Sequence, residues 1–185
     1  MDEQTIEQLG NFLEKKHKRF AQAQTGMGLV ITDKCPVGCI HCISNNFLQK
    51  GGVPDQDILR SRIDNLSKLN IFERIIITGG EPFYALGLLV TLVHYCASKN
   101  FKVSTVTSAY WASSVKKAKK SISILHKSGL EALAISMDIY HQEKIPYRNI
   151  IHVLEACHQL DIPNTVVFTW SGNREKDQDL LDSFK

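Results

Sequence analysis

The sequence predicts an α/β fold in which about five parallel strands alternate with helices. Two observations support this prediction: short apolar segments recur along the chain, and longer segments with helical periodicity lie between them. Such alternation is typical of a parallel sheet with right-handed crossovers. The second apolar segment contains three consecutive isoleucines, Ile75, Ile76 and Ile77, which favours a strand buried on both faces.

The length and composition are those of one soluble domain. The chain has 185 residues, of which 43% are hydrophobic and 22% charged, and its net charge of +3 is too small to indicate nucleic-acid binding. No apolar run is long enough to span a membrane, and residues 1–24 are too charged for a signal peptide. We therefore expect a soluble, cytoplasmic protein that binds neither nucleic acid nor a membrane.

The first half of the chain is predicted to open with a helix over residues 2–24, where apolar residues recur at helical spacing. This helix defines an N-terminal segment, residues 1–25, ahead of a core domain over residues 26–185. Pro54 and Asp55 are typical of the start of a helix. The next predicted elements are a strand at 26–32, a helix at 54–70 and a strand at 73–78.

The second half continues the same alternation. Gly129 is typical of the residue that follows the C-terminus of a helix. Leu180, Leu181 and Phe184 indicate the start of one more helix near the end of the chain. The other predicted elements are helices at 82–100, 113–128 and 146–160 and strands at 101–107, 130–137 and 162–168.

Cys35, Cys39 and Cys42 follow the first predicted strand at C-x3-C-x2-C spacing. Three thiolates this close can hold three irons of a 4Fe-4S cluster and leave the fourth iron free for another ligand. The alternative is a zinc site, but zinc normally needs four ligands, and His41 adjoins Cys42 too closely to be a good fourth one. Iron–sulfur binding is therefore the favoured interpretation.

Two further cysteines, Cys96 and Cys157, lie inside predicted helices. Neither has a second cysteine at ligand spacing, and the odd total of five cysteines does not resemble a disulfide framework. We expect both to be small buried hydrophobic residues.

A second motif, Gly79, Gly80, Glu81 and Pro82, follows the second predicted strand. Two glycines let a ligand approach bare backbone, and a glutamate can pair with a cationic amine. The alternative is a tight turn that opens a helix, because proline suits the first helical position. Since the carboxyl ends of parallel strands meet at one edge, this motif and the three cysteines are expected to lie together.

Other polar residues are predicted at the same edge. Ser136 and Asp138 are two residues apart and share one face at the end of the fourth strand, although Asp138 is also a candidate helix N-cap. His141 is a further candidate there. Thr107 ends the third strand and either contributes to cofactor binding or forms part of a simple turn. Trp170 either lines a substrate pocket or packs in the hydrophobic core.

Together, the cysteine motif and the Gly-Gly-Glu-Pro motif resemble those of radical S-adenosylmethionine (SAM) enzymes. The resemblance covers residues 26–170 and implies an incomplete TIM-like barrel. It also implies a 4Fe-4S cluster held by Cys35, Cys39 and Cys42, with SAM at the free iron. Eight residues are assigned to SAM binding, by the resemblance and by their place at this edge of the sheet. They are Gly79, Gly80, Glu81, Pro82, His41, Thr107, Ser136 and Asp138.

The resemblance further implies an oxidoreductase-like activity. A reduced cluster cleaves SAM to a 5′-deoxyadenosyl radical, which abstracts hydrogen from the substrate, and a flavodoxin- or ferredoxin-type protein supplies the electron. The stretch from Ser136 to His141 is similar to peptide-modifying relatives, which suggests a peptide substrate. The open alternatives are an electron-transfer iron–sulfur module, a glycyl-radical activating enzyme and a zinc-binding scaffold.

The sequence departs from the family pattern in two places. Ser108 and Ala109 stand where many relatives have Asn-Gly. The superfamily core usually has six strands, whereas this sequence stops soon after the fifth. The chain is therefore expected to be either a naturally short barrel or a piece of a longer protein.

Overall fold

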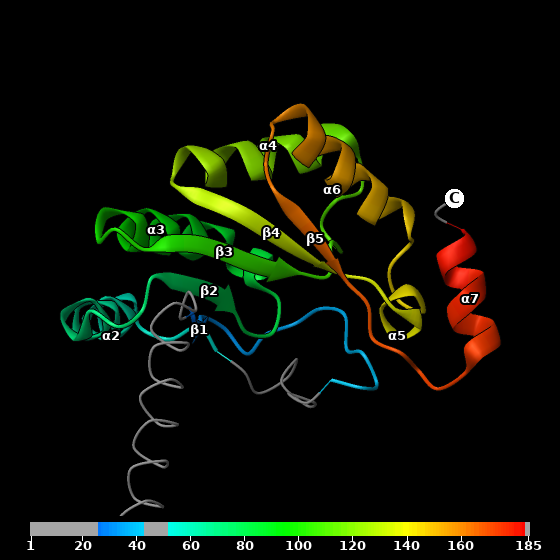
Figure 1. The fold of residues 1–185 in the computed structure, drawn as a ribbon, viewed down its shortest axis with the longest axis horizontal. Helices are drawn as coiled ribbons and strands as arrows, with labels where there is room; N and C mark the ends of the chain where they lie inside the picture. The colour runs from blue at the N-terminus through cyan, green and yellow to red at the C-terminus, as the bar shows by residue number, and fades with distance from the viewer. Residues whose placement is uncertain (1–25, 43–51, 184–185) are drawn as a thin grey trace, which may run out of the picture.

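The computed structural model describes residues 26–42 and 52–183 (Figure 1). The helix expected over residues 2–24 lies outside these ranges. The division of the chain at residue 25 therefore stays a prediction.

A single parallel sheet of five strands organises the described residues (Figure 1). Each strand pairs with the next one in the chain, so the order in the sheet is β1-β2-β3-β4-β5. This arrangement confirms the predicted α/β class and matches part of a TIM-like barrel. The strands are β1 Gly26–Val30, β2 Arg74–Thr78, β3 Lys102–Thr107, β4 Leu130–Ser136 and β5 Asn164–Val167.

The helices agree with the predicted segments, with three differences. The last helix, expected to start near Leu180, begins at Arg174. The segment expected as one helix at 82–100 begins with a 3-10 turn, η1, before α3, and a short helix, α5, follows β4. Asp138 caps α5 by accepting a hydrogen bond from the backbone amide of His141, so its N-cap interpretation is confirmed. The helices are α2 Gln56–Leu69, η1 Pro82–Ala85, α3 Leu86–Ser98, α4 Val115–Lys127, α5 Ile139–Gln142, α6 Arg148–Gln159 and α7 Arg174–Asp182.

The main hydrophobic core lies between the sheet and the helices that connect its strands. Ile75 and Ile77 of β2 are fully buried in it, whereas Ile76 between them is only half-buried. Burial on both faces was expected here, but it holds for one face only. The strands pair in chain order, and their connections are expected to be right-handed crossovers, which place the connecting helices on one face of the sheet. The opposite face of the sheet therefore lies toward the inside of the partial barrel.

The fifth strand is the open edge of this sheet. All four residues of β5 are exposed, in contrast to the alternating burial of β2 and β3.

Among the described residues, no helix combines the length and apolar character that crossing a membrane requires.

Candidate functional site

The three motif cysteines lie together in the loop that follows β1. Cys35, Cys39 and Cys42 belong to a small cluster, separate from the main core, whose buried members include Val37 and Ile145. All three are free thiols, and the backbone amide of Cys42 donates a 3.1 Å hydrogen bond to the carbonyl of Cys39. The structure therefore places the three thiols together in the loop after the carboxyl end of β1, and their role as metal ligands stays a prediction.

The cysteine loop, defined as residues 31–42, is clamped to the Gly-Gly-Glu-Pro turn at residues 79–82. The backbone amide of Gly80 donates a 2.7 Å hydrogen bond to the carbonyl of Thr32, and that of Glu81 donates a 2.9 Å bond to the carbonyl of Lys34. A Cβ atom at Gly79 would overlap the Thr32 carbonyl, and one at Gly80 would overlap the Lys34 carbonyl. The two glycines are thus required by the close approach of the cysteine loop.

The carboxylate of Glu81 is buried, with 1% of the residue exposed. Its Oε1 accepts hydrogen bonds from the Thr107 hydroxyl at 2.8 Å and the Phe83 amide at 3.2 Å. Its Oε2 accepts from the amide of Ser108 at 2.8 Å and also from the Ser108 hydroxyl. Protein donors therefore occupy about four acceptor sites, the full capacity of a carboxylate.

Burial raises the pKa of Glu81, although the hydrogen bonds from Ser108, Thr107 and Phe83 act in the opposite direction. The bonds from Thr107 and Ser108 tie the end of β3 to the turn after β2. Pro82 is buried at the start of η1, which Glu81 caps, so the helix-start interpretation of this motif is confirmed.

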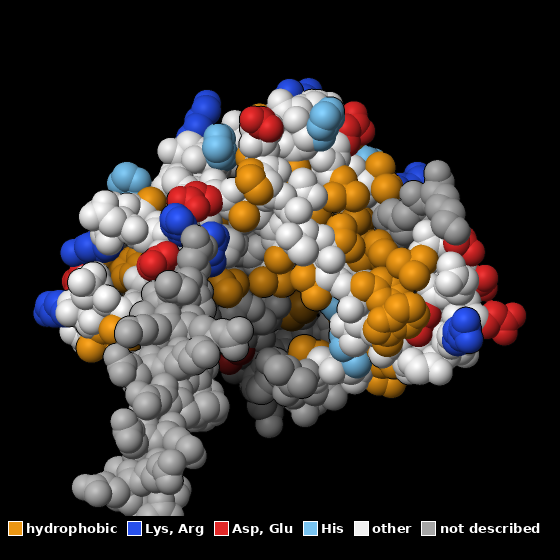
Figure 2. Space-filling view, viewed as in Figure 1, with side chains coloured by type: hydrophobic (Ala, Val, Ile, Leu, Met, Phe, Trp, Pro, Cys, Tyr) orange, Lys and Arg blue, Asp and Glu red, His pale blue; other side chains and the backbone are white. Residues whose placement is uncertain are grey.

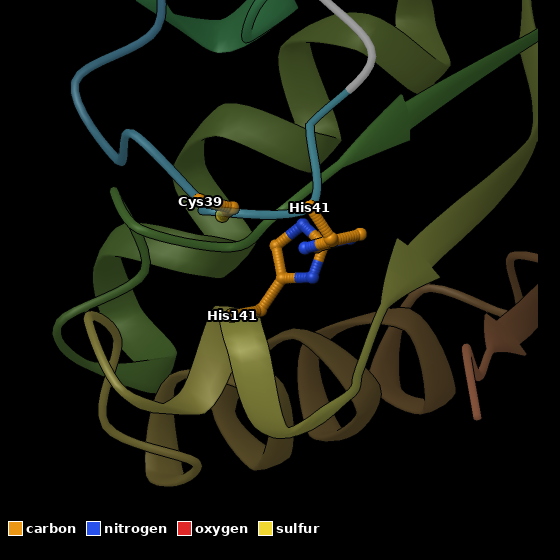
Figure 3. Close-up of side chains that lie close together, drawn as sticks. All are labelled: Cys39, His41 and His141. Atoms are coloured by element: carbon orange, nitrogen blue, oxygen red, sulfur yellow. The ribbon is translucent and has the colours of Figure 1, made fainter. Parts of the chain in front are cut away.

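A second group of polar residues lies around α5 and contains Asp138, His141 and His41. Asp138 is 1% exposed, and its Oδ1 lies 2.9 Å from Nδ1 of His141. Its Oδ2 lies 3.7 Å from Nε2 of His41. His41 stacks on Tyr140 with 4.5 Å between the ring centroids. Ligand atoms of Cys39, His41 and His141 all lie within 4.8 Å of one another (Figure 3).

The electrostatics of this group are coupled. Burial alone would raise the pKa of Asp138, but its hydrogen bonds with His141 outweigh burial and lower it. Burial alone would lower the pKa of His141, but hydrogen bonds with Asp138 and Cys39 raise it to about 9. Asp138 and His141 therefore each favour the charged form of the other.

Two other predicted residues have simpler surroundings. Ser136 is half-buried at the end of β4. Trp170 is 65% exposed, and its ring meets that of Phe168 edge-on with 5.2 Å between the centroids. Hydrophobic side chains lie exposed along β5 and the segment after it (Figure 2). The core-packing interpretation of Trp170 is therefore wrong.

Sequence reasoning missed two polar residues on α6 that position the loop after β3. Asn149, only 6% exposed, donates hydrogen bonds from Nδ2 to the carbonyls of Ala109 at 3.1 Å and Tyr110 at 3.2 Å. Nδ1 of His152 lies 2.8 Å from the Ala112 carbonyl. The sequence contained one signal for Asn149, which lies on the apolar face of a predicted helix. A buried side-chain amide needs hydrogen-bond partners, so a structural role could have been expected there.

The donor set fits an iron–sulfur cluster with three protein ligands. Cys96 and Cys157 are fully buried in the main core on α3 and α6, where burial raises their pKa values to about 12 and about 11. They are therefore poor candidates for a fourth ligand. Burial also raises the pKa of Cys35, so metal binding there has to release its proton.

Three neighbouring cysteines at the carboxyl edge of a parallel α/β sheet are typical of proteins that bind a metal cluster. Comparison with known proteins identifies the family. The model of the radical SAM superfamily matches residues 29–185. The chain belongs to this superfamily. Membership implies a 4Fe-4S cluster and SAM as cofactors and a need for an electron donor.

Similarity to curated proteins covers only parts of them. The chain is 24% identical over 136 residues to GTP 3′,8-cyclase of Lactiplantibacillus plantarum, covering 71% of this chain and 39% of that protein. It is 35% identical over 68 residues to an uncharacterized protein of Methanocaldococcus jannaschii, covering 37% of this chain and 23% of that one. The chain therefore spans well under half the length of either relative.

Solved structures share the fold at low sequence identity. Methylornithine synthase (PylB) superposes with a TM-score of 0.65 at 14% identity, covering 100% of this chain and 57% of that chain. BtrN, in complex with AdoMet and 2-DOIA, gives a TM-score of 0.53 at 14% identity, covering 80% of this chain and 56% of that chain. These matches support the assignment of the sheet as part of a TIM-like barrel.

Proposed function

We propose that this chain binds a 4Fe-4S cluster through Cys35, Cys39 and Cys42 and SAM at the iron that they leave free. The observation that carries the proposal is the clamp between the cysteine loop and the Gly-Gly-Glu-Pro turn. It joins the proposed cluster ligands and the proposed SAM-binding turn in one unit. When bound, the two cofactors supply a 5′-deoxyadenosyl radical that takes hydrogen from a substrate.

The protein's own contribution is to fix these two elements at the sheet edge. Glu81 receives hydrogen bonds from Thr107 and Ser108 and so anchors the turn to β3. We include Gly79, Gly80, Glu81 and Pro82 in the SAM site. The carboxylate of Glu81 can accept a hydrogen bond from the amino group of SAM only by releasing one of its present donors.

The remaining proposed SAM contacts are at the ends of β3 and β4 and in the cysteine loop. Thr107, Ser136, Asp138 and His41 supply hydroxyl, carboxylate and imidazole groups at this edge of the sheet. These groups suit the ribose hydroxyls and the charged methionine part of SAM.

The comparisons do not support the peptide substrate that the sequence suggested. The matched proteins with functional names are a GTP cyclase, methylornithine synthase and BtrN, and none of these names refers to a peptide substrate. We therefore propose the radical-initiating reaction alone, with a flavodoxin- or ferredoxin-type protein as the electron donor.

The test is reductive cleavage of SAM by the full chain after anaerobic reconstitution with iron and sulfide. With dithionite as the reductant, we expect 5′-deoxyadenosine to accumulate with the native sequence. A Cys39→Ala variant should produce none, while Cys157→Ala, a change in the main core, should retain the reaction. A cluster that binds no SAM and cleaves none would instead identify an electron-transfer module.

A further inference from the structure

Three potential metal ligands from two distant segments of the chain meet beside α5. Cys39 and His41 belong to the cysteine loop, and His141 belongs to α5. One ligand atom from each residue lies within 4.8 Å of the other two (Figure 3). The nitrogen and sulfur ligands of a tetrahedral zinc ion lie roughly 3.3–3.6 Å apart, given bond lengths of about 2.0–2.3 Å. Small side-chain rotations therefore bring all three residues onto one zinc ion.

Asp138 faces a ring nitrogen of both histidines. Its Oδ1 lies 2.9 Å from Nδ1 of His141, which leaves Nε2 of that ring for a metal. Its Oδ2 lies 3.7 Å from Nε2 of His41. Nδ1 of His41 is buried and has no hydrogen-bond partner among the described residues, although a buried polar atom normally has one. Histidines that bind a metal usually direct their other nitrogen at a carboxylate or carbonyl, and both rings are placed to do so.

The rings and charges of this group also suit a divalent cation. The two imidazoles meet edge-on with 5.0 Å between their centroids, and His41 is held from the other side by stacking on Tyr140. Asp138 is 1% exposed and Cys39 is 6% exposed. A carboxylate and a thiolate together balance the two charges of Zn²⁺, and a buried charge needs such compensation.

We propose that the cluster-free chain binds one zinc ion through Cys39, Nδ1 of His41 and Nε2 of His141. Water completes the four ligands, as in zinc sites that have three protein ligands. Asp138 is the positioning residue for both rings. Zinc and the iron–sulfur cluster then exclude each other, because both need Cys39; this exclusion rests on the proposed function, whereas the zinc site itself does not.

The competing possibility is that the three motif cysteines hold the zinc by themselves. Cys35 and Cys42 would then be required, and both histidines would be dispensable. The site proposed here makes the opposite demand, because it needs His141 and does not use Cys35. Variants of these two residues therefore separate the two arrangements.

The experiment titrates the iron-free, anaerobic full chain with Co²⁺, whose tetrahedral complexes absorb visible light, and then displaces it with Zn²⁺. We expect one metal ion per chain, lost in Cys39→Ala and His141→Leu. Asp138→Asn should weaken binding on the order of 10- to 100-fold, although asparagine also caps a helix. Cys35→Ala should bind as the native chain does, and so should the control His94→Leu, which changes an exposed histidine of α3.

Three results would overturn the inference. They are a native chain that binds neither Co²⁺ nor Zn²⁺, native binding in His141→Leu, and loss of binding in Cys35→Ala. If circular dichroism shows that His141→Leu does not fold, His141→Gln decides by the same criterion. Iron uptake on reconstitution is measured separately, so a chain that binds zinc and never assembles a cluster would contradict the proposed function and leave the zinc site standing.

Discussion

The hydroxyl of Thr107 donates a 2.8 Å hydrogen bond to Oε1 of Glu81 in the interior of the protein. Thr107 is the last residue of β3, and Glu81 lies in the turn after β2, so this bond joins the ends of two neighbouring strands. The next residue, Ser108, holds the other carboxylate oxygen. Glu81 is thus a structural centre of the proposed SAM site, whatever its direct contact with SAM.

Glu81→Gln is predicted to destabilise the protein and weaken SAM binding. The change replaces one carboxylate oxygen with an NH2 group that faces the amide of Ser108 or of Phe83, and the amide left without an acceptor costs about 1–3 kcal/mol. Urea unfolding and SAM titration of the reconstituted protein measure the two effects. Glu131→Gln, at an exposed position of β4, is the control. Native stability in Glu81→Gln would show that the buried hydrogen bonds are not needed.

Gly80→Ala is predicted to displace the cysteine loop and reduce the iron bound per chain. Its Cβ would overlap the backbone carbonyl of Lys34, which belongs to the loop and cannot rotate away as a side chain can. Gly87→Ala is a matched control, because a Cβ at Gly87 in α3 would meet no atom within 4 Å apart from its chain neighbours and the adjacent helix backbone. That control should be native or more stable by about 0.5–1 kcal/mol, since alanine is the better helix former. Equal iron in both variants would contradict the clamp.

Asn149→Ala is predicted to lower the free energy of unfolding by about 1–3 kcal/mol, because it removes the partner of two carbonyls in the loop after β3. Urea denaturation measures the change. Asn164→Ala, at an exposed position of β5, removes a single bond to the Ile162 carbonyl and should have a smaller effect. The reverse order of the two effects would rule out the role given to Asn149.

The stability contribution of Asp64 is predicted to depend on pH. Hydrogen bonds from Lys99 and Tyr95 lower the pKa of Asp64 and link α2 to α3. A carboxyl whose pKa is lower in the folded state stabilises the protein above its ordinary pKa, and the contribution is lost as the pH falls through the folded value. Asp64→Asn should therefore lower the thermal midpoint slightly at neutral pH, and this difference should shrink as the pH falls below the ordinary aspartate pKa of about 3.9. A difference that stays constant with pH would contradict this prediction.

Much of the fold was predictable because strand–helix alternation is a local pattern. The five strands and the cysteine loop after β1 follow from short segments of sequence. The half-burial of Ile76 was not predictable, since it depends on which face of the sheet the helices cover. The short helix α5 was missed because four residues show no helical periodicity, although Asp138 carried its N-cap signal.

The motif residues were predictable as neighbours at one edge of the sheet, but their contacts were not. The backbone of Thr32 and Lys34 occupies the space where side chains at Gly79 and Gly80 would stand. That contact joins segments far apart in the sequence, and no local pattern reports it. The enclosure of Glu81 by donors from β3 was hidden for the same reason.

The proposed function requires that Cys35, Cys39 and Cys42 hold a cluster with one iron free for SAM. Electron paramagnetic resonance of the reduced, reconstituted chain, recorded with and without SAM, is the measurement that decides this. We expect about four irons per chain and a 4Fe-4S signal that changes when SAM is added. A signal identical in both samples, or one that survives Cys39→Ala, would refute the proposed function.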